Sequence, residues 1–559
     1  MHAICLTTQL FLVAITTLSM TFACSSQKEL TINTRVWDME KSPSSFPELF
    51  DSELRVPWIT QRSSFGAAFS GGGTRSASAT LGQLRALKKL GWLDKLQYIS
   101  AISGGSWAAV PFVYLPASYD ESIFLGSYAS PRSLKKDILE MSTPGSLARA
   151  IHKSRLGLRY LREQAMLRGD ESYSRTIGDI FLAPFDLNER HRFFSFHKGA
   201  FRSVQSENKK LDLKETDFYF VRDGRPYLIV GGTLLGTDDD DLRYAYQVEM
   251  TGLYTGIYKK GALLNKFIGG GYIESFAYDS KDPIQAGNRF VSATIDSRRH
   301  RFTLSDVIGI SGAAPEHAAR AAGLRNTGLP EISYWPVDLS TPWHEYPHGD
   351  GGHIDNLGLM PLLKRQVKNI IVFVNTPIPF SCSSNPPAMT DDIIGYFKQV
   401  PYISKIKPGY IHNIIFDESK LNNLQNGLCM QAKSNKTLVY CDKYTVKNND
   451  HYGIQSYNSN ICWVYLDRNT NWINLVMQGN LENKYKEQLN KSSDSFKHFP
   501  HYDTFIENKP FVIDLSAIQV NTLSHLTAWT LCDGQSEIAK NLTADGLNLS
   551  LEPHPWDCN

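Results

Sequence analysis

Two glycine-rich stretches decide the fold: FGAAFSGGGTRS at residues 65–76 and YISAISGGSW at residues 98–107. Each begins with a short apolar run, typical of a buried strand, and breaks at glycine before a helical segment. The helix predicted between them carries one apolar face and ends at Gly91; the face comprises Leu81, Leu84, Leu87 and Leu90. This βαβα order predicts a parallel sheet covered by helices.

The same regular pattern returns further along the chain. Residues 302–322 are ordered, residues 359–367 resemble a helix, and residues 369–375 read NIIVFVN, an apolar strand. We therefore predict an α/β fold, a three-layer α/β/α sandwich with a mainly parallel central sheet. It would carry a large insertion between residues 103 and 350 and a cysteine-containing C-terminal elaboration from about residue 376.

The composition is that of a globular protein able to bury a sizeable core. Of 559 residues, 42% are hydrophobic and 20% are charged, and the formal net charge is +2. No long basic stretch or basic–aromatic alternation is present, so nucleic acid is not an expected partner. The acidic run from Asp238 to Asp241 is interpreted as a solvated loop, with a cation site as the alternative.

The N-terminus resembles a secretory leader. Residues 10–17 read LFLVAITT, and no charged side chain precedes Lys28. We predict a signal peptide over residues 1–23, an N-terminal extension over 24–60 and one α/β domain over 61–559. Ala23 and Cys24 resemble a bacterial lipobox, so the exported protein would be secreted or anchored through Cys24; an ordinary signal peptide with an incidental cysteine is the alternative.

The cysteines are unevenly distributed. Six of the eight lie after residue 380: Cys382, Cys429, Cys441, Cys462, Cys532 and Cys558. An even number in an exported chain predicts three disulfides, whose pairing the sequence leaves open. No cysteine or histidine spacing is typical of zinc, and no metal or other cofactor is expected.

The triple glycine, Gly71 to Gly73, lies between a predicted strand and a predicted helix. Without Cβ atoms the backbone turns tightly and presents its N–H groups closely to a ligand. Such groups at a helix N-terminus stabilise a developing oxyanion, and they also bind nucleotide phosphate. The lysine of a P-loop and the spacing of a dinucleotide fingerprint are both missing from this stretch, which favours the first interpretation.

Further candidates for chemistry lie outside the triple glycine. Ser103 stands in the sequence AISGG, which has the form of a nucleophile elbow, although a buried serine in a glycine turn would read the same way. Asp350 directly precedes two glycines, and it is interpreted either as a catalytic base or as a turn-forming residue. Ser311, in GISGA, resembles a second elbow but is interpreted as a small-residue packing turn. Three histidines near Asp350 are interpreted as lining or surface residues, with a triad member or metal ligand as the alternative: His344, His348 and His353.

Taken together, SGGGTRS at 70–76, SGGSW at 103–107 and DGG at 350–352 resemble the catalytic domain of cytosolic phospholipase A2 and its fungal phospholipase B (lysophospholipase) relatives. The continuation through Asp355 and Asn356 is similar to the DGGxxDN stretch of the patatin-like phospholipases. Ala101 stands where a nucleophile elbow usually has glycine.

The resemblance implies a serine–aspartate dyad. Ser103 would be the nucleophile and Asp350 the base, Gly72 and Gly73 would supply the oxyanion hole, and Arg75 would bind substrate near its phosphate or help to hold the site. The implied reaction is hydrolysis of fatty-acyl esters of phospholipids or lysophospholipids through an acyl-enzyme. Its partner would be phospholipid at a membrane or micelle surface. A non-catalytic lipid-binding surface protein, and a general esterase or acyltransferase, are the alternatives.

Overall fold

The computed structural model describes residues 29–165, 171–236, 245–263, 266–296, 301–316, 319, 327–401, 408–503, 514–549 and 558. The predicted leader, Cys24 and the acidic run from Asp238 to Asp241 lie outside these residues. Within the described part, none of the helices has the length and apolar character needed to cross a membrane.

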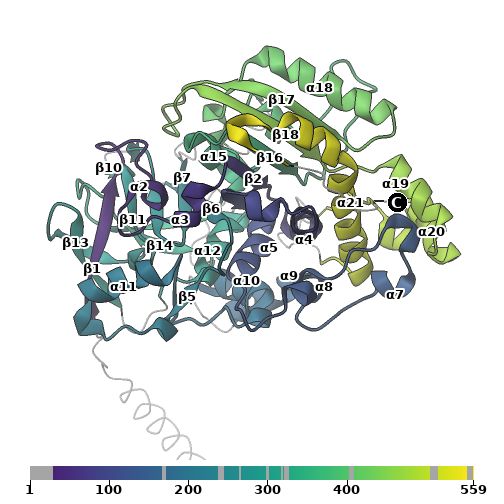
Figure 1. Cartoon of the computed structure of the whole chain (residues 1–559). Coiled ribbons are helices and arrows are strands. Elements are labelled where there is room, and N and C mark those ends of the chain that lie inside the picture. The colour runs from purple at the N-terminus through teal and green to yellow at the C-terminus, as the bar shows by residue number, and fades with distance from the viewer. Residues whose placement is uncertain are drawn as a thin grey trace, which may run out of the picture.

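A 14-stranded sheet forms the centre of the molecule (Figure 1). Its middle strands run parallel, in the order β6, β3, β2, β16, β18. Their bounds are Tyr227–Leu235, Tyr98–Ile102, Phe65–Phe69, Asn369–Val374 and Tyr457–Tyr465. The two predicted strands at the glycine-rich stretches are therefore neighbours, with Phe69 paired to Ala101.

The prediction of a mainly parallel sheet is wrong, because the sheet is mixed. Beyond β6 the strands pair antiparallel, beginning with β7 (Ala245–Thr251) and β8 (Tyr254–Ile257). Only two residues separate β7 from β8, and so short a connection permits only an antiparallel pair. The middle of the chain thus extends the sheet by hairpins and not by βαβ units.

Helix α4 (Gly73–Lys89) follows β2 and helix α5 (Gly104–Val113) follows β3, as predicted. The α4 helix ends where the sequence indicates, since Gly91 has φ +67°, a backbone angle that favours glycine. The C-terminal helix α21 (Ala517–Asn541) packs along α4, and Figure 1 shows the two side by side. Thr527 Oγ1 donates to the Ala79 carbonyl oxygen across their interface, at 2.9 Å.

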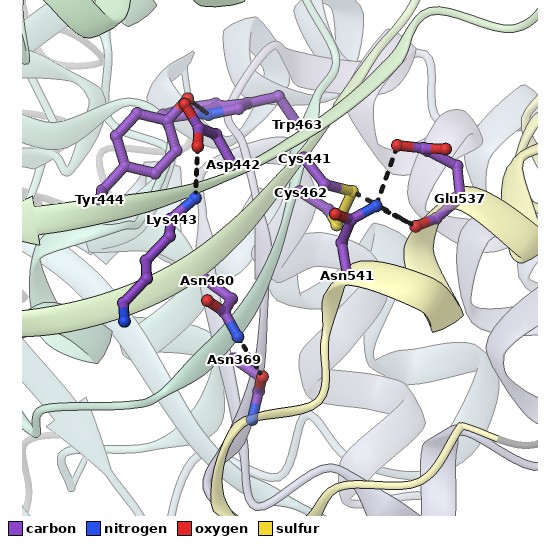
Figure 2. Close-up of a disulfide and its surroundings, with 10 residues drawn as sticks. All are labelled: Asn369, Cys441, Asp442, Lys443, Tyr444, Asn460, Cys462, Trp463, Glu537 and Asn541. Carbon is purple, nitrogen blue, oxygen red and sulfur yellow. Dashed lines mark hydrogen bonds between the residues drawn. A yellow bond between two sulfur atoms is a disulfide. The ribbon is translucent and has the colours of Figure 1, made fainter.

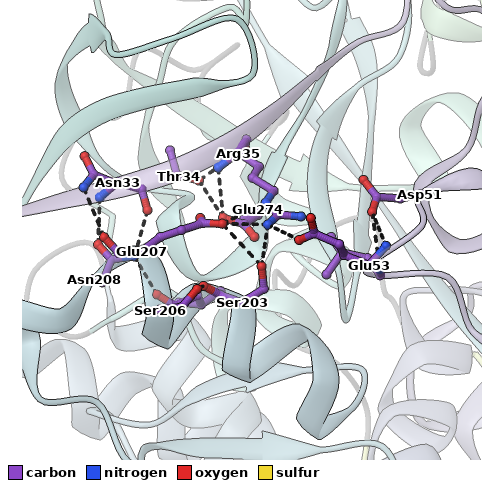
Figure 3. A network of polar contacts seen from close by, with 12 residues as sticks. Asn33, Thr34, Arg35, Asp51, Glu53, Ser203, Ser206, Glu207, Asn208 and Glu274 are labelled. Atoms are coloured by element: carbon purple, nitrogen blue, oxygen red, sulfur yellow. Dashed lines mark hydrogen bonds and ion pairs between the residues drawn. The ribbon is translucent and has the colours of Figure 1, made fainter.

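Strand β1 (Glu29–Asp38) places part of the predicted N-terminal extension inside the sheet. Residues 29–35 of β1 pair with β13 (Phe290–Asp296), and residues 36–38 pair with β11 (Gly271–Glu274). Arg35 stands where β1 changes partner, and its guanidinium bonds Glu53, Ser203 and Glu207 (Figure 3). These contacts tie β1 to two other segments of the chain.

Glu274 is buried beside this network. Its Oε2 accepts the Arg35 backbone N–H at 2.9 Å, and the Thr34 hydroxyl lies at 3.4 Å (Figure 3). Burial, together with the nearby Glu207 charge, raises the pKa of Glu274 to about 8. The folded pKa exceeds the unfolded value of about 4.3. The stabilisation from the protonated carboxyl is therefore complete below about pH 4.3 and is lost as pH rises through the folded pKa.

We expect the free energy of unfolding to fall as pH rises from about 5 to about 8, by on the order of 2–4 kcal/mol from this group. Glu274→Gln keeps a neutral side chain at all pH values and should flatten that dependence. Urea unfolding at several pH values measures it, with Glu215→Gln on the exposed surface as the matched control. An unchanged pH dependence in Glu274→Gln would contradict the assignment.

The C-terminal part adds strand β17 (Val439–Val446) beyond β18. The prediction that the six late cysteines form disulfides is confirmed, and the pairs are Cys382–Cys429, Cys441–Cys462 and Cys532–Cys558. Cys441 and Cys462 face each other in the β17–β18 ladder, beside Glu537 and Asn541 of α21 (Figure 2).

Candidate active site

Strand β6 is the platform on which the two principal candidate residues meet. Along one edge of β6, β3 pairs parallel up to Ile102, which lies opposite Gly231. Strand β15 (His344–Asp350) pairs antiparallel with the next part of the same strand, and Asp350 lies opposite Gly232. The two strands therefore end head-on at consecutive β6 residues, whose Cα atoms are ~3.8 Å apart. Ser103 directly follows one strand, and Asp350 is the last residue of the other.

The pair Gly231-Gly232 is required by this arrangement. A Cβ at Gly231 would overlap the Ile102 side chain, and a Cβ at Gly232 would lie 2.7 Å from Ile310 Cγ2. Two glycines inside an otherwise apolar strand are a sequence signal for such a close approach of other segments. Sequence reasoning did not use that signal.

Ser103 sits at the turn between β3 and α5, with φ 49° and ψ −125°. Few non-glycine residues adopt such a conformation, and it is typical of functional sites in which the surroundings hold a strained backbone. The residue is 6% exposed. Its backbone N–H donates to Ser311 Oγ at 2.9 Å, and its carbonyl oxygen accepts the Ser106 hydroxyl at 2.7 Å.

The glycine loop lies against this elbow. Gly72 and Gly73 have φ +132° and +56°, so both positions favour glycine. A Cβ at Gly71 would lie 3.1 Å from the Ser103 Cβ, and a Cβ at Gly104 would overlap the Gly73 carbonyl oxygen. The N-termini of α4 and α5 thus come together at Ser103, where both helix dipoles favour negative charge.

Asn356 joins the glycine loop to the Asp350 loop. Its carbonyl oxygen accepts the Gly71 N–H at 2.8 Å. Its side-chain oxygen lies so close to both Gly71 and Gly352 that a Cβ at either position would overlap it or crowd it. Asp392 and Tyr410 hold Asn356 in place, through its side-chain amide (2.6 Å) and its backbone N–H (3.0 Å).

Asp350 is 5% exposed and fixed through three groups. Its Oδ1 accepts the Gly352 N–H at 2.7 Å, its carbonyl oxygen accepts the Thr233 hydroxyl at 2.9 Å, and its N–H donates to the Ala313 carbonyl at 3.3 Å. Helix α14 (Gly352–Asp355) begins directly afterwards. The carboxylate is therefore oriented by the backbone of its own loop.

Arg75, in the first turn of α4, is 4% exposed. Its Nε and Nη1 donate to the carbonyl oxygens of Asn375 and Tyr502, at 3.1 and 2.6 Å. Burial lowers the pKa of Arg75 to about 10, so the guanidinium remains charged at neutral pH. It also lies against Gly72, since a Cβ there would be 2.5 Å from its Nη2. These contacts connect the glycine loop to the end of β16.

The three candidate histidines have different surroundings. His348 is fully buried, with Nε2 3.0 Å from the Tyr278 hydroxyl and Nδ1 2.9 Å from the Tyr346 carbonyl, and burial lowers its pKa to about 4. His344 starts β15, roughly 20 Å along the strand from Asp350. His353 packs beside Gly349. In the described part of the chain, no three His, Cys, Asp or Glu side chains are arranged to hold a metal ion.

Ser311 closes helix α12 (Leu304–Ser311) and is fully buried. Its hydroxyl donates to the Gly231 carbonyl at 2.7 Å while accepting the Ser103 N–H. The sequence interpretation of a packing turn did not include these polar contacts. The small residues of GISGA indicated close packing, but the hydrogen bond to residue 103 spans 208 positions and has no local signal.

Comparison with known proteins finds one curated relative of note. A segment of 65 residues, 11% of this chain, is 40% identical to mouse cytosolic phospholipase A2 zeta. The chain resembles cytosolic phospholipase A2. The matched segment covers only 8% of the length of the mouse protein. No family model matches the chain.

Solved structures of human GIVD cytosolic phospholipase A2 are also similar. One covers 90% of this chain and 65% of the human chain, at 12% identity and a TM-score of 0.47. Another, of the same human protein with methyl gamma-linolenyl fluorophosphonate, covers 87% and 59%, at 13% identity and a TM-score of 0.39.

Proposed function

We propose that the protein is a serine acyl hydrolase that cleaves fatty-acyl ester bonds of phospholipids or lysophospholipids. The observation that carries the proposal is the head-on meeting of β3 and β15 on β6, which brings Ser103 and Asp350 to one edge. The glycine loop against Ser103 and the resemblance to cytosolic phospholipase A2 support it further.

In the proposed mechanism, the Asp350 carboxylate takes the Ser103 hydroxyl proton as Oγ attacks the ester carbonyl carbon. The N–H groups of Gly72 and Gly73 bind the oxyanion, and the N-termini of α4 and α5 add to its stabilisation. Collapse breaks the C–O bond, and Asp350 returns its proton to the leaving alcohol. Water then attacks the acyl-enzyme by the same route and releases the fatty acid.

Arg75 has a supporting role in this proposal. Its hydrogen bonds to Asn375 and Tyr502 and its position against Gly72 favour holding the glycine loop in its strained conformation. A charged guanidinium beside that loop would also attract a substrate phosphate. We also propose that helices cover both faces of the sheet as a three-layer α/β/α sandwich. In this arrangement the segment between residues 103 and 350 is a large insertion.

The test is hydrolysis of defined substrates by the purified protein. Release of fatty acid should be measured from a diacyl phospholipid, from a lysophospholipid and from a short-chain ester, with fluorophosphonate labelling alongside. Turnover of either phospholipid, together with labelling at Ser103, is the expected result. Turnover of the short ester alone would contradict the proposal and favour a general esterase. A protein that shows neither turnover nor labelling would contradict it as well, and would favour the non-catalytic lipid-binding alternative.

We also propose that the protein is exported, because three disulfides form in an oxidising compartment. The mature protein should lack residues before about Cys24, and its six late cysteines should show no free thiols. Intact-mass measurement before and after alkylation checks both expectations, and a lipid adduct on Cys24 would identify an anchor. Intact Met1 with six alkylated cysteines would contradict export.

A further inference from the structure

One buried turn contacts both halves of the proposed dyad. It comprises Ser311, Gly312 and Ala313, at the end of α12, and we refer to it as the α12 turn. On the nucleophile side, Ser311 Oγ accepts the Ser103 N–H at 2.9 Å and donates to the Gly231 carbonyl at 2.7 Å. The Ser311 hydroxyl thus bridges the elbow and the platform strand.

On the other side, the α12 turn holds the Asp350 loop. The Asp350 N–H donates to the Ala313 carbonyl at 3.3 Å, and the Gly351 N–H lies 3.4 Å from the Ser311 carbonyl oxygen. The Gly312 carbonyl accepts the Tyr173 hydroxyl, which supports the turn from α10 (Ser172–Phe181). All three residues of the turn therefore offer a carbonyl group to a neighbouring segment.

Helix α12 is itself anchored to the helix that follows the nucleophile. Trp107 of α5 donates from Nε1 to the Ile308 carbonyl at 3.2 Å, and its ring lies against Gly312. A capping box of Thr303 and Asp306 fixes the other end of α12. The Ser311 hydroxyl is therefore presented from a rigid support, which is what a positioning group requires.

We infer that Ser311 is a positioning residue, whose hydroxyl holds Ser103 in its strained backbone conformation at the correct place relative to Asp350. The inference rests on the proposed function. Ser103 has φ 49° and ψ −125°. Such a strained backbone conformation persists only where several surrounding contacts hold it in place. With its N–H engaged by Ser311, Ser103 does not offer that group to an oxyanion.

The experiment compares Ser311→Ala with the wild type on the phospholipid that the wild type hydrolyses. Ser311→Ala removes one oxygen atom and no carbon, so the fold should be retained. We expect kcat to fall about 10- to 100-fold with KM nearly unchanged, since a small misplacement of the nucleophile affects the chemical step. The second-order rate of fluorophosphonate labelling at Ser103 should fall by a similar factor. Ser311→Thr keeps the hydroxyl and should restore most of the loss.

Ser459→Ala is the matched control. Ser459 is also a buried serine whose hydroxyl donates to a backbone carbonyl, that of Val367, but it lies at the opposite end of the parallel strands. Its kcat should be unchanged, and its melting temperature should fall no more than that of Ser311→Ala, because the Val367 carbonyl still accepts the Tyr457 hydroxyl.

The outcomes separate this inference from the proposed function. A wild type that neither hydrolyses phospholipid nor labels at Ser103 contradicts the proposed function itself. Wild-type kcat and labelling rate in Ser311→Ala, while Ser103→Ala is inactive, overturns the inference alone. A rise in KM with unchanged kcat, or an equal loss of kcat in Ser459→Ala, overturns it as well.

Discussion

Ser103→Ala should abolish ester hydrolysis while leaving the fold intact. Removing the nucleophile of a serine hydrolase typically lowers kcat by roughly 10⁶-fold, because the remaining groups act only through binding and the oxyanion hole. The change deletes a side-chain oxygen only, and the backbone N–H can still bond Ser311 Oγ. Fatty-acid release and fluorophosphonate labelling measure the effect, with the melting temperature as the measure of folding.

Ser100→Ala is the comparison for this variant. Ser100 lies on β3, three residues before Ser103. It is fully buried, and its hydroxyl has no hydrogen-bond partner within the described residues. Its removal should leave kcat within about twofold of the wild type, since no bond is lost. Substantial activity in Ser103→Ala, with loss in another serine variant, would sink the nucleophile assignment.

Much of the fold around Ser103 follows from short-range signals in the sequence. The strands at 65–69 and 98–102, the glycine turns after them and the helix ending at Gly91 all stand where the pattern predicts. Each depends on local hydrophobic periodicity and on backbone angles that glycine alone favours. Those rules act over a few residues, so they can be applied without knowing the tertiary structure.

The parts that sequence reasoning missed depend on contacts between distant segments. The mixed sheet arises because the strands after β6 return by hairpins, and β15 meets the end of β3 only through its pairing with β6. Likewise, Asn356 is part of the stretch similar to DGGxxDN, but its position between Gly71 and Gly352 is visible only in the folded structure. Local pattern carries no information about which strand edge a later strand will join.

The Asp350 side chain differs from the histidines in how it is placed for chemistry. It ends β15 at the residue opposite Gly232, next to the end of β3, and its Oδ1 is held by the Gly352 N–H. Both nitrogens of His348 already face Tyr278 and Tyr346, and burial lowers its pKa to about 4. His353 is the histidine that remains near Asp350 in sequence, so it is the variant that matters most as a comparison.

Asp350→Asn should therefore lower kcat by roughly 10²–10⁴-fold or more, because in the proposed mechanism Asp350 is the general base and acts as a unit with the nucleophile. The amide keeps the shape of the side chain and can still accept the Gly352 N–H, so the melting temperature should change little. His344→Ala and His353→Ala should each stay within about tenfold of the wild-type kcat.

The pH profile gives a second measure. An aspartate base stays ionised well below pH 6, whereas an enzyme with a histidine base of ordinary pKa loses activity as pH falls through about 6.5. A folded His353→Ala as inactive as Ser103→Ala, with wild-type kcat falling below pH 6.5, would require a Ser–His–Asp triad in place of the dyad.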